Sequence, residues 1–238
     1  MEQKQLFFSI IIPAHNEEKY IGETLTNIKN LNYPTERFEA VVVENGSTDK
    51  TYEIAKKMAE KNIFVFSATT KGVSLARNFA INKTRPAGDW VISLDADTIL
   101  KTDFLKNLDI YLRKNTNKNF AVGTTSLEPF PETARAKRWF RFYDICHRLF
   151  KASYSIQIIK RSLLKTIKYD ERMEMAEDLK MIKDARRFGG FFFFSTKTVY
   201  TSTRRFEQVG WWKIFFQWTF VANLPHFLQK KHLYKITR

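Results

Sequence analysis

Hydrophobic and polar positions in the first hundred residues alternate in blocks that predict strands and helices in turn. Short apolar runs rich in β-branched and aromatic residues predict buried strands, and apolar positions three or four residues apart predict helices between them. Such alternation favours a doubly wound, mainly parallel sheet flanked by helices. The expected strands are 7–12, 40–43, 63–66 and 90–94. Three helices are expected between them: the first starts after a cap at or around Asn16, the second contains Ile54 and Met58, and the third covers 73–81.

The second half of the chain is less regular and richer in aromatic residues. Its basic, aromatic segments predict a mixed region that ends in a helical, aromatic-rich part. We expect helices over 132–151, 161–167 and 174–188, a strand over 154–159, a strand pair or one bent strand from 191–194 and 198–202, and an aromatic stretch over 209–228.

Composition narrows the class of protein. Hydrophobic residues make up 44% of the 238 residues and aromatic residues 15%, which is too apolar for an intrinsically disordered chain. The single cysteine, Cys146, excludes an internal disulfide framework and a cysteine-only zinc site, and it indicates a reducing compartment. We expect no signal peptide, because the apolar run at 6–12 is short and lacks a cleavage pattern.

The formal net charge of +15 indicates a polyanionic partner, which could be nucleic acid, an anionic membrane surface or a phosphorylated small molecule. Charge alone does not choose among these three classes, and solvated lysine-rich helices would explain it equally well. The acidic residues are fewer, and their positions along the chain are more specific evidence.

Polar and partly acidic segments follow three of the predicted strands, at 13–17, 44–47 and 95–97. Ligands of doubly wound sheets bind beyond the carboxyl ends of the strands, so these segments would form one acidic pocket. Asp95 and Asp97 would share a face of an extended backbone. Two such carboxylates suit a hard divalent cation completed by water and substrate phosphates, whereas an isolated Asp-x-Asp would more often cap a turn.

Two further charged clusters lie in the second half. Glu177 and Asp178, preceded by Glu174 at helical spacing, offer a carboxylate that could take a proton from an acceptor hydroxyl. Acids at a helix start are otherwise explained by the helix dipole. Arg204 and Arg205 could hold a pyrophosphate through bidentate contacts, or could form a solvated basic turn.

These clusters belong to six segments that stand in a fixed order along the chain. Their sequences and spacing resemble those of family 2 glycosyltransferases, the inverting enzymes with the GT-A nucleotide-sugar fold. The similarity is strongest from about residue 7 to 105 and continues more weakly to about 212. The segments are SIIIPAHNEE (9–18), VVVENGSTDKT (41–51), KGVSLARNFAI (71–81), GDWVISLDADT (88–98), EMAEDLKM (174–181) and TSTRRF (201–206).

The resemblance implies a GT-A-like fold and a role for each matching residue. Asp178 would be the general base, and Asp95 and Asp97 would hold Mg²⁺ or Mn²⁺. Where the family has an acidic pair this chain has Glu44 and Asn45, and near Arg204 it lacks the Gln and Trp of the processive signature, which implies a non-processive enzyme. The implied nucleotide-sugar-binding residues are Pro13, His15, Asn16, Glu17, Glu44, Asn45, Arg77, Asp95, Arg204 and Arg205.

The implied function is metal-dependent inverting transfer of a hexosyl or related group from a nucleotide-diphosphate sugar to a glycan or lipid-linked acceptor, as in cell-envelope synthesis. A nucleotidyltransferase on a similar fold is an alternative, but it would favour a Gly- and Arg-rich loop after the first strand. A basic nucleic-acid-binding protein would leave the acidic strand ends unexplained. A degenerate, non-catalytic member is disfavoured by the intact Asp95, Asp97 and Asp178.

We divide the chain into a catalytic domain at 1–208 and a basic, aromatic helical segment at 209–238. Within the domain, 1–105 would bind the nucleotide sugar and 106–208 the acceptor. The stretch 209–228 could lie on a membrane, pack on the domain or span a bilayer, and its three tryptophans with flanking lysines favour the first. We therefore expect a cytoplasmic protein, peripheral on the anionic inner face of the membrane, and no nucleic-acid partner.

Overall fold

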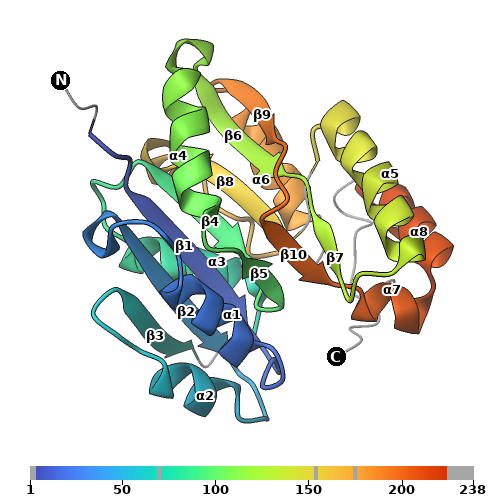
Figure 1. Cartoon of the computed structure of the whole chain (residues 1–238), viewed down its shortest axis with the longest axis horizontal. Helices are drawn as coiled ribbons and strands as arrows, with labels where there is room; N and C mark the ends of the chain where they lie inside the picture. The colour runs from blue at the N-terminus through green and yellow to red at the C-terminus, as the bar shows by residue number, and fades with distance from the viewer. Residues whose placement is uncertain (1–3, 69–70, 153–154, 174–175, 224–238) are drawn as a thin grey trace.

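The computed structural model describes residues 4–68, 71–152, 155–173 and 176–223, and its centre is a seven-stranded sheet (Figure 1). The sheet order is β3-β2-β1-β4-β8-β6-β9, and every neighbouring pair is parallel except the two pairs made by β8. This arrangement confirms the predicted mainly parallel α/β fold. The strands are β1 (Phe8–Ala14), β2 (Phe38–Asn45), β3 (Ile63–Ala68), β4 (Trp90–Leu94), β6 (Phe120–Thr125), β8 (Ile156–Lys160) and β9 (Gly190–Phe194).

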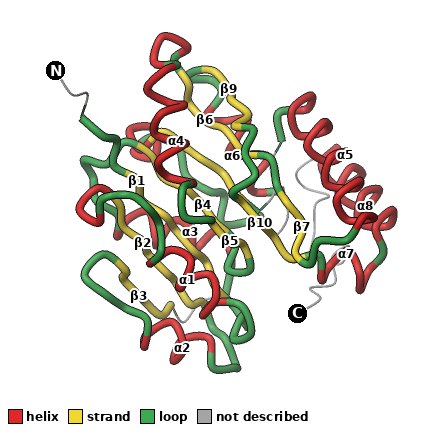
Figure 2. The backbone as a smooth tube through the Cα atoms, in the orientation of Figure 1, coloured by secondary structure: helices red, strands yellow, loops and turns green. Residues whose placement is uncertain are grey.

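Helices flank this sheet, and a second group of helices stands beyond one of its edges (Figure 2). The α-helices are α1 (Ile21–Lys29), α2 (Thr51–Lys57), α3 (Val73–Lys83), α4 (Phe104–Lys114), α5 (Ala134–Phe150), α6 (Glu177–Ala185), α7 (Arg204–Val209) and α8 (Trp211–Asn223). Short 3₁₀ helices are η1 (Thr35–Arg37), η2 (Thr116–Lys118) and η3 (Arg161–Lys165).

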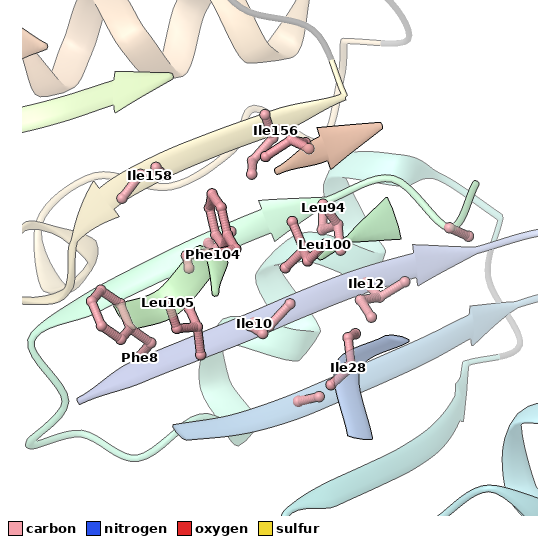
Figure 3. Packing of buried hydrophobic residues seen from close by; sticks show 14 of the residues in the cluster. Phe8, Ile10, Ile12, Ile28, Leu94, Leu100, Phe104, Leu105, Ile156 and Ile158 are labelled. Atoms are coloured by element: carbon pink, nitrogen blue, oxygen red, sulfur yellow. The ribbon is translucent and has the colours of Figure 1, made fainter. Parts of the chain in front are cut away.

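Alternate residues of the central strands face opposite sides of the sheet, and each side has its own core. Ile10 and Ile12 of β1 pack with α1 and α4 on one side, as the close view in Figure 3 shows for part of that core. Ile11 packs on the other side with α3 and α6. Because helices cover both sides, the central strands are buried along nearly their whole length, which explains their continuous apolar runs.

A smaller sheet of three strands lies beside the main one, in the order β5 (Thr98–Leu100), β10 (Val199–Ser202) and β7 (Glu128–Phe130). The expectation that 191–194 and 198–202 form a strand pair or one bent strand is therefore wrong. Strand β9 pairs with β6 in the large sheet, whereas β10 pairs with β5 and β7 in the small one. The chain leaves the large sheet at the Ser195–Lys197 connection, where Ser126 Oγ donates a hydrogen bond to the Thr196 carbonyl.

The other predicted elements form close to their expected positions. The strand at 90–94 has the predicted bounds, and the segment at 161–167 is a 3₁₀ helix that ends at Lys165. The first helix begins later than expected from a cap at or around Asn16: α1 starts at Ile21 after Tyr20, with no side-chain cap, and Asn16 has a left-handed backbone with φ 56°. Parts of three predicted elements lie outside the described residues: residue 154, residues 174–175 and, in the aromatic C-terminal segment, everything from 224 onward.

The C-terminal helices α7 and α8 lie next to α5, at the end of the molecule that β7 and β10 reach (Figure 1). Trp211 and Ile214 of α8 are buried in the same core cluster as Phe140 of α5 and Phe206 of α7. Within the residues described, we find no helix with the length and apolar character needed to span a membrane.

Candidate active site

The carboxyl ends of β1, β2 and β4 meet at one edge of the sheet, because these strands are parallel neighbours. Hydrogen bonds tie the first two of their loops together. His15 Nδ1 lies 3.1 Å from the carbonyl oxygen of Asn45, and the Asn16 amide donates to Ser47 Oγ at 3.0 Å. The Glu18 amide donates to Asp49 Oδ2 at 3.1 Å. The sheet topology therefore brings the predicted polar segments together, as expected for this fold.

Asn16 and Glu44, two residues predicted to bind the nucleotide sugar, form hydrogen bonds that fix the conformation of these loops. The Asn16 side-chain oxygen accepts a hydrogen bond from the Thr48 amide at 2.8 Å, and asparagine tolerates the left-handed backbone needed there. The buried Glu44 carboxylate accepts hydrogen bonds from Ser67 Oγ at 2.8 Å and from the Ser47 amide. Pro13, still within β1, pairs with Val43 of β2 and leads into this edge.

The third loop is a turn. The Thr98 amide donates to the Asp95 carbonyl at 3.1 Å, and Thr24 of α1 donates to the Ala96 carbonyl at 2.7 Å. The extended backbone expected between Asp95 and Asp97 is therefore wrong. Asp97 nevertheless lies within the electrostatic reach of Asp95: burial first, and then the charge of Asp95, raise the pKa of Asp97 to about 7.

Arg204, at the start of α7, joins the first and third loops. One guanidinium nitrogen lies 2.7 and 2.8 Å from the two carboxylate oxygens of Glu17, and 3.2 Å from Asp97 Oδ2. The guanidinium also lies over the ring of Tyr20, 4.4 Å from its centre. The adjacent Arg205 is half-buried, and its charge opposes the rise in the pKa of Asp97. The predicted arginine pair therefore lies within the acidic edge.

Arg77 of α3 forms a second bridge, on the other side of Asp95. Its guanidinium lies 2.6 Å from Glu177 Oε1 and 3.4 Å from Asp95 Oδ1. It also lies 5.1 Å from the centre of the Tyr169 ring. Because the Arg77 side chain is only 9% exposed, these two carboxylates and the ring compensate most of the cost of its burial.

Asp178 stands in the first turn of α6, directly after Glu177. The residue before this turn, Ala176, has φ 58°, an uncommon left-handed conformation for alanine. The Asp178 carboxylate accepts a hydrogen bond from the Leu179 amide at 2.8 Å, and its main-chain oxygen accepts one from Gln157 Nε2 at 2.9 Å. Burial, followed by the charge of Glu177, raises the pKa of Asp178 above its usual range. Such a carboxylate is a better proton acceptor than an exposed one.

Three polar residues around this site were not predicted as site residues. Tyr20 and Tyr169 contact the two arginines, and Gln157 contacts the Asp178 backbone. Gln157 carried a signal, because it is a polar residue inside the apolar run Ile156–Ile159. The two tyrosines carried none, since tyrosine is common in any aromatic-rich chain.

The donor set fits a hard divalent cation that takes few protein ligands. Nowhere in 4–68, 71–152, 155–173 or 176–223 do three His, Cys, Asp or Glu side chains cluster as a complete metal site. Mg²⁺ and Mn²⁺ need no such cage, because one or two carboxylates plus water and substrate phosphates suffice. The Asp95 carboxylate is 40% exposed, and its charge destabilises ionised Asp97, so a cation bound beside them would relieve this repulsion.

Known proteins are similar to this chain in sequence and in fold. The family model described as "Glycosyl transferase family 2" matches residues 9–169. Poly(ribitol-phosphate) beta-N-acetylglucosaminyltransferase TarS of Staphylococcus aureus is 30% identical over 216 residues, which cover 83% of this chain and 36% of TarS. A dolichyl N-acetyl-alpha-D-glucosaminyl phosphate 3-beta-D-2,3-diacetamido-2,3-dideoxy-beta-D-glucuronosyltransferase of Methanococcus voltae is 38% identical over 124 residues, 49% of this chain and 38% of that protein. The chain thus spans under two fifths of either relative.

Solved structures agree at the level of the fold. Residues 1–349 of S. aureus TarS in complex with UDP-GlcNAc match with a TM-score of 0.67 and 24% identity, over 83% of this chain and 58% of that one. The mannosyltransferase PcManGT of Pyrobaculum calidifontis, in complex with GDP-Man and Mn²⁺, matches with a TM-score of 0.64 and 19% identity, over 84% of this chain and 57% of that one.

Proposed function

This chain belongs to glycosyltransferase family 2, and from that membership we propose that it transfers a sugar from a nucleotide-diphosphate donor to an acceptor hydroxyl with inversion at the anomeric carbon. One observation carries the proposal. Carboxylates from three separate segments gather with Arg77 and Arg204 at the carboxyl edge of a parallel sheet. They are Glu17, Asp95, Asp97 and the pair Glu177 and Asp178.

The donor would lie across the loops after β1, β2 and β4. His15, Asn16, Glu44 and Asn45 shape the loops that would hold the nucleoside, while Arg77, Arg204 and Arg205 would face the diphosphate. Arg204 already binds two carboxylates through one nitrogen, so a phosphate oxygen could take the place of either of them. The arginines would thus balance the charge that develops on the leaving diphosphate.

Asp178 would act as the general base. Its raised pKa matches the task of accepting a proton from a hydroxyl near neutral pH. The acceptor oxygen would bond to the anomeric carbon while the carbon–oxygen bond to the diphosphate breaks. The hydroxyl proton goes to Asp178, and the nucleoside diphosphate leaves with the bonding electron pair. A single displacement inverts the configuration.

Asp95 and Asp97 would hold Mg²⁺ or Mn²⁺, which when bound would supply positive charge next to the diphosphate. The M. voltae and S. aureus relatives are named for a dolichyl-phosphate-linked acceptor and for a poly(ribitol-phosphate) acceptor. We extend the proposal to an acceptor of this chemical class, a lipid-linked or cell-envelope glycan. The enzyme would work non-processively on the cytoplasmic face of the membrane, with 1–105 binding the donor, 106–208 the acceptor and 209–238 the membrane.

Replacing the base tests the mechanism directly. Asp178→Asn keeps an oxygen that can accept the Leu179 amide hydrogen bond but removes the proton acceptor. We expect a loss of at least about 100-fold in sugar transfer or donor hydrolysis with little change in donor affinity. The matched control is Asp184→Asn on the same helix, whose carboxylate binds only Lys180 and Arg187 among the contacts found in the described chain. A fully active Asp178→Asn enzyme would exclude Asp178 as the base.

The metal requirement is tested by binding as well as by turnover. UDP-GlcNAc and GDP-mannose are the first donors to try, each titrated by calorimetry with Mg²⁺, with Mn²⁺ and with a chelator. We expect donor binding to weaken in chelator and in the Asp97→Ala variant. NMR of the product's anomeric proton reports inversion or retention. Donor affinity that is unchanged in chelator would count against a metal held by Asp95 and Asp97.

A further inference from the structure

Two helices next to the catalytic edge carry large apolar side chains that are exposed among the described residues. On α5 and α8, seven such side chains are between 36% and 77% exposed. They repeat at helical spacing, so each helix shows a single apolar stripe. The stripe of α5 is Phe142, Ile145, Leu149 and Phe150, and the stripe of α8 is Trp212, Phe216 and Phe220.

The two stripes touch and form one surface. The rings of Phe142 and Trp212 lie 6.5 Å apart, and Trp139 of α5 lies 4.7 Å from Trp212. The opposite faces of the helices are buried, through Phe140 on α5 and Trp211 on α8. We call the joined stripes of α5 and α8 the α5–α8 surface. The helices are thus fixed to the domain by one face, and the side chains of this surface are exposed in the part of the chain that the structure describes.

The charge of these two helices is strongly one-sided. They contain six Lys and Arg residues against one acidic residue, Asp144, which is half-buried. Three of the arginines, Arg138, Arg141 and Arg148, are exposed at positions next to the apolar stripe of α5, and Lys213 is exposed on α8. A complementary partner of this surface would therefore offer both apolar groups and many negative charges.

We propose that the α5–α8 surface binds the surface of an anionic lipid bilayer. Tryptophan and phenylalanine insert at the headgroup level while Arg and Lys contact the lipid phosphates, which is the pattern of helices that lie in the interface. Over their described residues α5 and α8 have 17 and 13 residues, fewer than the about 20 that cross the hydrocarbon core, and we place both helices along the bilayer surface. The inference deepens the proposed function by naming the partner, and it rests on that function only for the acceptor's location.

Binding of the α5–α8 surface to a bilayer would also fix the distance between the membrane and the active site. Arg204, which binds Glu17 and Asp97, is the first residue of α7, and α8 begins two residues after α7 ends. Phe206 of α7 stacks on Trp211 of α8, with ring centres 4.9 Å apart. A bilayer at the α5–α8 surface therefore lies one short helix away from the catalytic edge, where a lipid-linked acceptor would be presented.

Vesicle flotation tests this surface with the whole protein. The probes are vesicles of phosphatidylcholine alone and of phosphatidylcholine mixed with phosphatidylglycerol. We expect binding to the anionic vesicles that weakens as salt is raised, with a blue shift in tryptophan fluorescence. The double variant Leu149→Ser and Phe216→Ser should lower the partition coefficient roughly tenfold or more. The matched control, Phe64→Ser and Phe188→Ser, changes exposed phenylalanines elsewhere and should bind normally.

Arginine variants and a measurement of the oligomeric state distinguish membrane binding from self-association. The variant Arg138→Gln and Arg141→Gln should weaken binding to anionic vesicles only. Wild-type protein that floats with neither vesicle at low salt overturns the proposal. A monomer–dimer change in the Leu149→Ser and Phe216→Ser variant, without vesicle binding by the wild type, would assign the surface to a second copy. Acceptor-free donor hydrolysis is measured in parallel, so a failed membrane proposal is distinct from a failed transferase proposal.

A separate observation concerns Asp178. The Tyr169 hydroxyl donates to Gln157 Oε1 at 2.5 Å, and Gln157 Nε2 donates to the main-chain oxygen of Asp178 at 2.9 Å. Asn78 holds the Tyr169 backbone at both of its polar groups, at 2.9 and 3.0 Å. Arg77 stacks on the Tyr169 ring and binds Glu177. These contacts form a closed ring of buried residues around the first turn of α6.

We infer that Tyr169 and Gln157 are positioning residues that fix the direction of the Asp178 carboxylate through its backbone. The Leu179 amide is the one hydrogen-bond donor found for that carboxylate among the described residues, so the orientation of the turn decides where its oxygens point. A base must lie within hydrogen-bond distance of the acceptor hydroxyl, so a small rotation of this turn lowers the rate. This inference rests on the proposed role of Asp178.

The test separates positioning from stability. Tyr169→Phe removes one hydroxyl and keeps the ring beneath Arg77, and Gln157→Met removes both hydrogen bonds. We expect kcat to fall about tenfold with the donor KM unchanged. Tyr33→Phe is the matched control, because it removes another buried tyrosine hydrogen bond, to the Leu6 carbonyl at 2.7 Å. Equal losses of kcat in Tyr33→Phe and Tyr169→Phe, or unchanged kcat in the latter, would overturn the positioning role. A transferase in which Asp178→Asn is active would instead refute the proposed base.

Discussion

The surroundings of Asp97 destabilise the ionised form of its carboxylate. Its side chain is only 16% exposed and stands close to Asp95 and Glu17, which are acidic like itself. Arg204 lies 3.2 Å away but also binds both oxygens of Glu17, so its charge is shared. Burial and the neighbouring acids outweigh this arginine, and the pKa of Asp97 rises to about 7. A carboxylate with a pKa raised in this way fits the proposed role of Asp97 in binding a cation beside a diphosphate.

This environment predicts a stability that depends on pH. In the unfolded chain Asp97 ionises near the ordinary aspartate pKa of 3.8, whereas in the folded protein its pKa is about 7. Between these values the folded state binds the extra proton, so the contribution of Asp97 to stability falls as pH rises through the window. Asp97→Asn should therefore raise the free energy of unfolding by roughly 1–3 kcal/mol at pH 8, and the gain should vanish near pH 4. Urea unfolding at the two pH values measures it.

Asp144 provides the control for this prediction. Burial raises its pKa to about 7 as well, but its carboxylate accepts a hydrogen bond from the Leu127 amide and lies outside the candidate site. Asp144→Asn should therefore show a smaller stabilisation of the same sign and keep transferase activity. Asp97→Asn should lose that activity. If Asp97→Asn is no more stable than wild type at pH 8, the carboxylate is better compensated than the structure indicates.

At this scale the sequence predicted acidic residues better than their partners. Asp95 and Asp97 were named from their position after a strand and Asp178 from the family resemblance, and in the structure Asp95 lies within electrostatic reach of both of the others. The bond between Arg204 and Glu17 joins residues 187 positions apart, and no local pattern encodes such a distance. The turn at 95–98 was missed because a side-chain hydrogen bond from Thr24 helps to hold it, and that bond also depends on the tertiary fold.

Among the elements, β6 shows how one small residue sets the packing. Gly123 faces the ring of Phe192 on β9, and a Cβ placed there would lie 2.5 Å from the ring carbons. The same ring packs against Trp90, Tyr111 and Phe120, with ring centres 5.0 to 5.8 Å away. Since this aromatic cluster fills the space between β6, β9 and α4, Phe192 has little room to move.

We therefore predict that Gly123→Ala is destabilising. The added methyl group forces Phe192 or the strands apart, which should lower the free energy of unfolding by about 1–3 kcal/mol. Gly22→Ala in α1 is the control, because its Cβ would find Ile54 at an ordinary 3.5 Å and alanine is the better helix former, by up to about 1 kcal/mol. Chemical denaturation of both variants measures the difference. Equal stability of the two would show that β6 and β9 adjust without strain.

Most elements with a clear local signal were predicted, whereas the short strands that depend on distant pairing were not. The strand at 90–94 is an uninterrupted apolar run and formed with the predicted bounds. Helix α4 was overlooked although Leu105, Leu108 and Leu112 have helical spacing and are buried. Strands β5 and β7 have three residues each, and they form because β10 lies between them. Three residues carry too little periodicity to predict a strand.

At the scale of the whole molecule, the acidic and basic residues that give the net charge of +15 are concentrated in different regions. Acidic side chains gather at the carboxyl edge of the sheet, where they alternate with Arg77 and Arg204. The helices α5 and α8 instead carry six basic residues and one acid beside an exposed apolar stripe. The sequence predicted both regions, but it could not show that α5 and α8 meet, because their residues are about 70 positions apart.

The last prediction concerns whether the segment that begins at 209 is an appendage or part of one folded unit. Trp211 is 3% exposed and belongs to the main core, whereas its neighbour Trp212 is 59% exposed. Trp211→Ala should lower the free energy of unfolding by about 3–5 kcal/mol, because it leaves a cavity against Phe206. Trp212→Ala should cost about 1 kcal/mol or less.

Both tryptophan variants are compared with wild type by urea unfolding, monitored by circular dichroism so that the loss of a tryptophan does not affect the signal. A large effect at Trp211 alone means that one face of α8 is anchored in the main core, whereas the face that carries Trp212 contributes little to folding stability. With such an anchor, the proposed binding of α8 to a bilayer would also fix the orientation of the rest of the protein, because the helix and the core form one packed unit. Small effects at both positions would instead mean that α8 is an appended segment, free to move relative to the active site.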